Sequence, residues 1–169
     1  SSILNYIPET NRSNLTQYPI KYVIISDPMF EASLQPLVDW KKRKGFNVIE
    51  AYTDVIGDTK EEIKTYIQGL YDNGTVEDPS PSFILFIGDL NTMPTYNNGD
   101  GVTDRNYVEY TGDLLPEIFY GRMSADTEAQ LDVIIGKTLQ YEKYTMPDPS
   151  YLDEVLLVSG VDGSFATNW

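Results

Sequence analysis

The chain has 169 residues, 41% of them apolar, so it can bury a core of ordinary domain size. Its 12 basic and 26 acidic side chains give a formal net charge of −14, which argues against a nucleic-acid partner and against membrane insertion and favours a cation. Cysteine and histidine are both absent, which excludes a thiolate nucleophile, an imidazole base and a Cys/His zinc site within these residues.

Hydrophobic periodicity predicts strands and helices that alternate along the first half of the chain. We expect a polar surface arm over residues 1–20, followed by a single subdomain over 21–169. The expected elements are a strand at 21–26, a helix at 30–44, a strand at 46–52, a helix from the Thr59 capping box to about Tyr71, and a strand at 83–87.

The second half of the chain is less regular. Short strands at 107–110 and 118–120 are expected to form a hairpin around Gly112-Asp113, before a long helix at about 126–143, capped by the Ser124-Ala-Asp126 segment, and a last strand at 154–161. Helical crossovers between strands predict an α/β fold. The fold should have a mainly parallel sheet, helices on both faces and a small β-hairpin insertion.

Four aspartates each follow an apolar, strand-like run: Asp27, Asp54, Asp89 and Asp162. If the runs are parallel strands of one sheet, the four carboxylates gather at its carboxyl edge, where open α/β sheets bind ligands. Each aspartate taken singly also fits an ordinary turn or helix N-cap.

One cation site is suggested by Asp113 and Glu117, which flank the Leu115 carbonyl and a proline, with Asp89 as a third carboxylate. Calcium takes six to eight oxygen ligands from such mixed carboxylate and carbonyl sets. The alternative is a hairpin turn with solvated side chains. Asp100 and Asp104, in a glycine-rich loop, form a second candidate with the same alternative.

Asp162 could orient a histidine in a nucleophile–His–Asp arrangement, but the histidine would have to come from outside this chain. The basic run 41–44 has a structural explanation, because cations at a helix C-terminus offset the helix dipole.

Five segments form an ordered set: Val38–Phe46, Phe86–Asp89, Gly121–Ala125, Tyr141–Lys143 and Met146–Leu152. Together they resemble the first half of the catalytic domain in gingipain-type cysteine peptidases, over about residues 20–165 and most nearly in the lysine-specific branch. The resemblance implies the first, caspase-like subdomain of a secreted or cell-surface bacterial endopeptidase that cleaves polypeptides. Its catalytic Cys and His would lie in a downstream subdomain, so this chain alone would be inactive.

The resemblance also implies roles for individual residues. It assigns Asp162 as the acidic partner of the catalytic histidine. It assigns a structural Ca²⁺ to Asp89, Asp113, the Leu115 carbonyl and Glu117. Thr111 departs from the pattern, because the lysine-specific branch has an acidic residue there.

Two other classes of protein remain open from the residues. Asp27, Asp54 and Asp89 fit a phospho-accepting receiver module with Mg²⁺, although the last predicted strand ends without the lysine that a receiver needs. A non-catalytic cation-binding domain is the other alternative.

Overall fold

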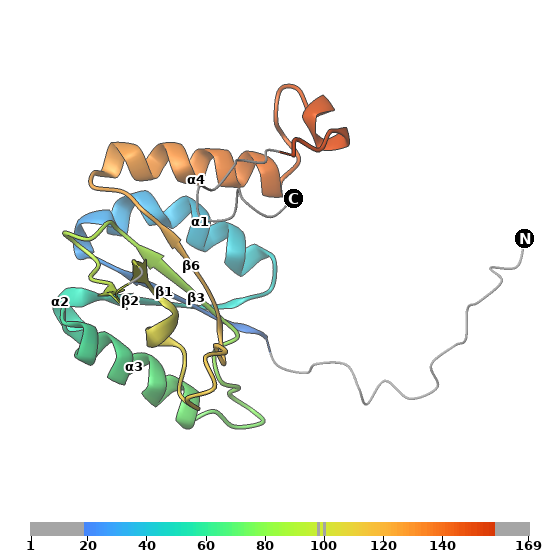
Figure 1. Cartoon of the computed structure of the whole chain (residues 1–169). Coiled ribbons are helices and arrows are strands. Elements are labelled where there is room, and N and C mark those ends of the chain that lie inside the picture. Colours follow the sequence, from blue (N-terminus) through green and yellow to red (C-terminus); the bar gives the residue numbers. More distant parts are fainter. Residues whose placement is uncertain (1–18, 98, 100, 158–169) are drawn as a thin grey trace, which may run out of the picture.

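The fold is known from a computed structural model that describes residues 19–97, 99 and 101–157. A four-stranded parallel sheet forms its centre, with strand order β2-β1-β3-β6 (Figure 1). The strands are β1 (Lys21–Ser26), β2 (Asn47–Tyr52), β3 (Phe83–Ile87) and β6 (Phe119–Met123).

Helices cover both faces of this sheet, as the sequence predicts. On one face, α1 (Glu31–Arg43) packs beside α4 (Glu128–Glu142) over a core that includes Leu34 and Leu131. On the other face, the short α2 (Thr53–Ile56) leads into α3 (Lys60–Asp72), which buries Ile63 and Ile67 (Figure 1). Because β1 and β3 are covered on both sides, their residues are apolar almost throughout.

The helix boundaries follow local capping chemistry. Thr59 and Glu62 form the predicted capping box of α3. The long helix begins slightly later than expected, because the Thr127 hydroxyl accepts the Gln130 N–H and caps α4, which lies after the predicted Ser124-Ala-Asp126 cap. Three single-turn 3₁₀ helices complete the helical elements: η2 (Pro28–Phe30), η3 (Arg105–Tyr107) and η4 (Ser150–Asp153).

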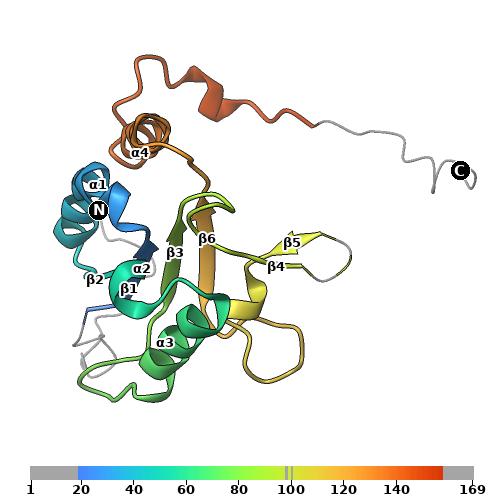
Figure 2. The ribbon, with the colours of Figure 1, turned by 90° about the vertical axis from the view of Figure 1, so that its left-hand side faces the viewer.

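The predicted hairpin around Gly112-Asp113 is wrong. The antiparallel pair is instead β4 (Tyr96–Asn97) with β5 (Val102–Thr103), which Figure 2 shows beside β6. Residues 119–123 instead pair in parallel with β3, and Phe119 donates its backbone N–H to the Ser82 carbonyl. One backbone hydrogen bond, from the Glu117 N–H to the Val108 carbonyl, joins the two segments that were expected to pair, but they form no antiparallel strands.

The predicted last strand at 154–161 is not formed in its described part. Residues 154–157 belong to no strand, and Val155, Leu156 and Leu157 are 84–88% exposed. Residues 158–161 and Asp162, like the predicted arm at 1–18, lie outside the described residues. No helix in the described part is long and apolar enough to cross a membrane.

A carboxylate at the end of α4 fastens the two helices of one face together. Glu142 accepts hydrogen bonds from Lys41 Nζ at 2.6 Å, Trp40 Nε1 at 2.8 Å and Lys44 Nζ at 3.2 Å, all at the end of α1. Burial alone would raise the pKa of Glu142, but these donors hold the pKa below its ordinary value. The basic run therefore has a structural role, as its position at a helix C-terminus predicts.

Glu142→Gln should destabilise the protein by about 1–3 kcal/mol at neutral pH, because it removes the charge from three hydrogen bonds. A carboxyl whose folded pKa is depressed contributes stability above its unfolded pKa and loses it as the pH falls through the folded value. The difference between wild type and variant should therefore start to shrink as the pH falls below the ordinary glutamate pKa of about 4.3, and should vanish only below the depressed pKa of the folded state. Urea unfolding from pH 3 to 7 measures it, with exposed Asp132→Asn in the same helix as the control. A difference that persists unchanged in acid would contradict this role.

Candidate functional site

The carboxyl edge of the sheet contains a switch point in strand order. The chain leaves β1 for β2 on one side and then returns to β3 on the other, which opens a crevice between the ends of the strands. A pocket of about 370 Å³ lies there, lined by Asp27, Asp54, Asp58 and Asn91 among others. The sheet thus brings Asp27 and Asp54 to one pocket, as their positions after strands predict.

Asp27 and Asp89, two of the three strand-end aspartates in the described residues, also have local structural roles. Asp27 caps η2 by accepting the Met29 N–H at 2.8 Å. Asp89 starts the turn after β3: its carboxylate accepts the Leu90 N–H at 2.8 Å, and its carbonyl accepts the N–H of Met93. These contacts agree with the ordinary reading of aspartate as a turn and cap residue.

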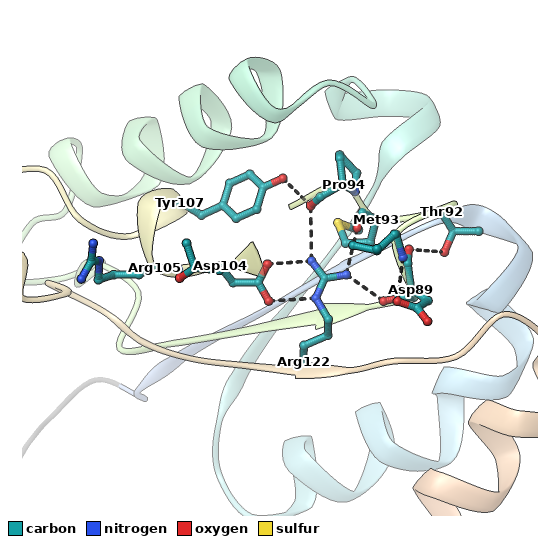
Figure 3. A network of polar contacts seen from close by, with 11 residues as sticks. Asp89, Thr92, Met93, Pro94, Asp104, Arg105, Tyr107 and Arg122 are labelled. Carbon is teal, nitrogen blue, oxygen red and sulfur yellow. Dashed lines mark hydrogen bonds and ion pairs between the residues drawn. The ribbon is translucent and has the colours of Figure 1, made fainter. Parts of the chain in front are cut away.

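A buried ion pair organises the segment that follows β3 (Figure 3). Arg122, on β6, donates from Nε and Nη2 to the two carboxylate oxygens of Asp104, each at 2.8 Å. Its Nη1 donates to the carbonyls of Gly88 at 2.8 Å and Met93 at 2.9 Å, and its Nη2 to that of Pro94 at 3.3 Å. The side chains of the pair are only 13% and 11% exposed, so the ion pair is largely buried.

Neighbouring groups complete this network, which we call the Arg122 clamp. The guanidinium lies over the Phe86 ring, 5.7 Å from its centroid. Tyr107, fully buried, donates its hydroxyl to the Pro94 carbonyl at 2.6 Å. Gly88 has φ +117°, and a Cβ there would lie 2.3 Å from the Thr92 hydroxyl, so the turn requires glycine. Asp104 therefore serves the fold and is not a free cation ligand.

A second carboxylate group lies in the loop before β6. One carboxylate oxygen each of Glu109, Asp113 and Glu117 lies within 4.8 Å of the other two. Among the described residues, no other set of three or more acidic side chains comes this close together. Backbone N–H groups hold the loop in shape: Gly112 donates to Glu109, Leu115 to Asp113 at 2.8 Å, and Tyr110 to Glu117 at 2.8 Å.

The charges in this loop are held close in spite of their repulsion. A hydrogen bond from Thr111 is the main reason that the pKa of Glu117 lies below its ordinary value, while the nearby Asp113 opposes that shift. A hard cation bound by these carboxylate oxygens would relieve the repulsion. Thr111 thus serves the loop as a hydrogen-bond donor at the position where the resemblance leads us to expect an acidic residue.

The predicted calcium ligands fall at two ends of the sheet. Phe83 pairs with Phe119 at the start of β3, and Ile87 pairs with Met123 at its end. Glu117 therefore lies at the amino edge and Asp89 at the carboxyl edge, separated by a strand about 16 Å long. The structure brings Asp113 and Glu117 together with Glu109, which sequence reasoning missed, and leaves Asp89 apart.

Arg122 was also missed as a site-forming residue, although it lies in one of the segments that carry the family resemblance. An arginine inside a strand, three residues after an exposed phenylalanine and so on the opposite side of the strand, is a signal of an inward-facing charge with a buried partner. The partner, Asp104, was considered only as a cation ligand.

Sheet order, two-sided helical cover and the adjoining hairpin define an α/β fold with a mainly parallel sheet and a small antiparallel pair. The sequence model of peptidase family C25 matches residues 15–168. The chain therefore belongs to peptidase family C25, a family of cysteine peptidases.

Relatives and solved structures agree with this assignment. The chain is 36% identical over 160 residues to Lys-gingipain W83 of Porphyromonas gingivalis, covering 92% of this chain and 9% of that protein. A solved protease structure superposes with a TM-score of 0.79 at 37% identity, over 86% of this chain and 33% of that chain. The Arg-specific cysteine proteinase gingipain R has the same fold, with a TM-score of 0.65 at 22% identity over 73% of this chain and 28% of that one.

Asp104→Ala should destabilise the protein by about 3–5 kcal/mol, because it leaves the Arg122 guanidinium buried without its counter-charge. Guanidinium chloride unfolding measures the loss. Asp39→Ala, an exposed aspartate on α1, is the matched control and should change stability by no more than about 0.5 kcal/mol. Equal effects of the two substitutions would show that the clamp does not stabilise the fold.

Proposed function

We propose that this chain forms the first subdomain of the catalytic domain of a bacterial cysteine endopeptidase. The observation that carries this proposal is the family match over residues 15–168, in a chain that contains neither cysteine nor histidine. A cysteine peptidase needs a thiolate and a base, so both must be supplied from outside these 169 residues. This chain alone is therefore expected to have no peptidase activity.

In this proposal the chain contributes the acidic member of the catalytic set. A downstream Cys thiolate attacks the scissile carbonyl, and a downstream His transfers the proton. Asp162, which follows the last predicted strand, accepts the hydrogen bond of the imidazole N–H and so fixes its tautomer and orientation. Asp162 lies outside the described residues, so its role rests on the family resemblance.

A downstream subdomain of the same polypeptide is the proposed partner. The exposed run Val155-Leu156-Leu157 supports it, because three consecutive apolar residues are typical of a strand buried on both faces, and here they are more than four-fifths exposed. The chain also spans only about a third of the solved protease that it matches. Polypeptides are the proposed substrates, and secretion or display on the bacterial surface is proposed from the resemblance to gingipains.

We also propose a structural Ca²⁺ at the loop 109–117. Glu109, Asp113 and Glu117 would supply carboxylate oxygens, and the Leu115 carbonyl is a further candidate ligand. The ion would offset three like charges and hold the loop against the amino edge of the sheet. Asp89 lies too far along β3 to bind the same ion, so a metal role for Asp89 would require a second one.

The receiver-like alternative has little support. A receiver needs its strand-end carboxylates close enough to share one Mg²⁺. In the described residues the carboxylates that meet this condition are in the loop 109–117, not Asp27, Asp54 or Asp89.

Asp162→Ala in the longer polypeptide that contains the downstream subdomain should lower kcat/KM for peptide cleavage by about 100-fold or more, because the imidazole loses its orienting partner. Kinetics on a panel of short peptide substrates measure the loss. Asp39→Ala is the control with unchanged activity. Unaltered kcat/KM in the Asp162 variant would remove this residue from the catalytic set.

Saturating Ca²⁺ should raise the unfolding temperature by several degrees, because a ligand at about 100 times its Kd adds about 2.7 kcal/mol to the stability of the folded state. Asp113→Asn should abolish the rise while still accepting the Leu115 N–H. Thermal scans with Ca²⁺, Mg²⁺ and chelator measure the effect, with Asp39→Asn as the control. The calcium proposal fails if the Asp113 variant responds as the wild type does.

A further inference from the structure

The crevice at the carboxyl edge of the sheet contains a buried hydroxyl that the fold does not use. Thr53, at the start of α2, is only 6% exposed and lines the crevice. Its hydroxyl makes no hydrogen bond with the described residues, yet no side-chain oxygen or nitrogen among them is both fully buried and unpaired. The hydroxyl of this buried residue is therefore open to the crevice that it lines.

Three carboxylates line the same crevice, those of Asp27, Asp54 and Asp58. Asp27 uses one oxygen to accept the Met29 N–H. The carboxylates of Asp54 and Asp58 form no hydrogen bond or ion pair with the described residues. No lysine or arginine is among the described residues that line the crevice. It therefore gathers three negative charges without a positive partner, and a cleft of one sign of charge focuses its field on a cation.

The spacing of these carboxylates excludes a single small cation as their shared ligand. A Ca²⁺ ion binds oxygens at about 2.3–2.6 Å and an ammonium nitrogen binds them at about 2.7–2.9 Å, so three oxygens that share either one lie within about 5 Å of one another. In the described part of the chain, only the carboxylates of the loop 109–117 come within 4.8 Å of one another as a set of three. A ligand that reaches all three aspartates must therefore carry more than one cationic group.

Part of the crevice lining is apolar. Pro28, Leu90 and Pro94 contribute to it, beside the polar Asn91 and Thr92. A hydrated metal ion gains nothing from apolar walls, whereas a short alkyl stem is removed from water there. The volume of about 370 Å³ is in the range of small-molecule sites. Ammonium groups joined by short alkyl stems match both the separated charges and the apolar walls.

We propose that this crevice binds a diamine or polyamine, a small molecule with two or more ammonium groups joined by short alkyl stems. Its ammonium groups donate to the carboxylates of Asp54 and Asp58, and one of them donates to the Thr53 hydroxyl oxygen. The site lies at the switch point in strand order, where open α/β sheets bind ligands. The inference goes beyond the proposed peptidase function and does not depend on it, because all these side chains belong to the described residues of this chain.

Calorimetric titration of the 169-residue chain in about 0.15 M salt tests the proposal with a matched pair of ligands. Butane-1,4-diamine should bind at least about tenfold more tightly than butylamine, which has the same four-carbon stem and only one ammonium group. Backbone amide NMR shifts should locate the bound diamine at Thr53, Asp54 and Asn91. Equal affinities of the two amines, or shifts spread over the whole acidic surface, would overturn the proposal.

Thr53→Val separates a binding role from a structural one. Valine has nearly the same shape, and the hydroxyl that it removes has no partner in the described residues, so the unfolding temperature should not fall. The affinity for the diamine should fall at least about fivefold, because an ammonium group loses an acceptor. Unchanged affinity in this variant would overturn the proposed site.

A second pair of variants controls for the net charge of the chain. Asp54→Asn should weaken diamine binding at least about fivefold. Asp39→Asn, at an exposed position on α1, removes the same charge outside the crevice and should change the affinity by no more than about twofold, because salt screens distant charges. Equal weakening by the two substitutions would show attraction by the overall charge, and the proposal would fail.

Other occupants give different results. Ca²⁺ that shifts the same amides and displaces the diamine would assign the crevice to a metal ion, and a lysyl-lysine amide that binds more tightly than the diamine would assign it to a basic polypeptide. Either result overturns the proposal. Peptide cleavage by the longer polypeptide is measured separately: cleavage without diamine binding refutes the crevice proposal alone, and diamine binding without cleavage refutes the peptidase function alone.

Discussion

The buried pair of Arg122 and Asp104 is the interaction on which the arrangement of this subdomain depends. One guanidinium uses its planar donors to hold a carboxylate and three backbone carbonyls from the irregular segment after β3. It acts together with two backbone hydrogen bonds, from the Gly88 N–H to the Met123 carbonyl and from the Asp89 N–H to the Ala125 carbonyl, which also fix the turn after β3 to the end of β6. The fully buried Tyr107, bound to Pro94, extends the same anchoring to the second core.

The two ends of the sheet carry two different candidate sites. At the carboxyl edge, strand order creates a crevice with Asp27 and Asp54, as parallel α/β sheets do wherever the direction of winding reverses. At the amino edge, the loop 109–117 concentrates carboxylates whose repulsion is relieved only partly by backbone N–H groups and Thr111. The proposed calcium ion would therefore bind at the end of the sheet opposite the crevice.

Much of the fold could be predicted from the pattern of apolar residues along the sequence. The strands at 21–26 and 83–87 were recognisable because apolar runs covered on both faces leave a continuous signal. The outer strand at 46–52 was also predicted, although it carries polar residues, and Thr59 marked the start of α3. The fourth strand was predicted only as a short hairpin strand at 118–120, because Phe-Tyr-Gly-Arg-Met contains a glycine and a charge, and only the tertiary partner Asp104 explains that charge. The carboxylate loop was predicted in part: Asp113 and Glu117 were named from spacing, but Glu109 joins them through a backbone path that spacing alone does not reveal. Asp89 was grouped with Asp113 and Glu117 as a calcium ligand because all three lie close to predicted strands. The sequence does not show that the loop 109–117 lies at the opposite end of the sheet from Asp89.

The central claim is that this chain is one part of a cysteine peptidase whose nucleophile and base lie elsewhere in the polypeptide. The most direct measurement is cleavage of a mixed peptide library by the 169-residue chain and by the longer polypeptide, each with and without a thiol-alkylating reagent. The account predicts cleavage by the longer polypeptide alone and its loss on alkylation, since the thiolate is the nucleophile. Cleavage by the 169-residue chain, or activity in the longer polypeptide that survives alkylation, would contradict it.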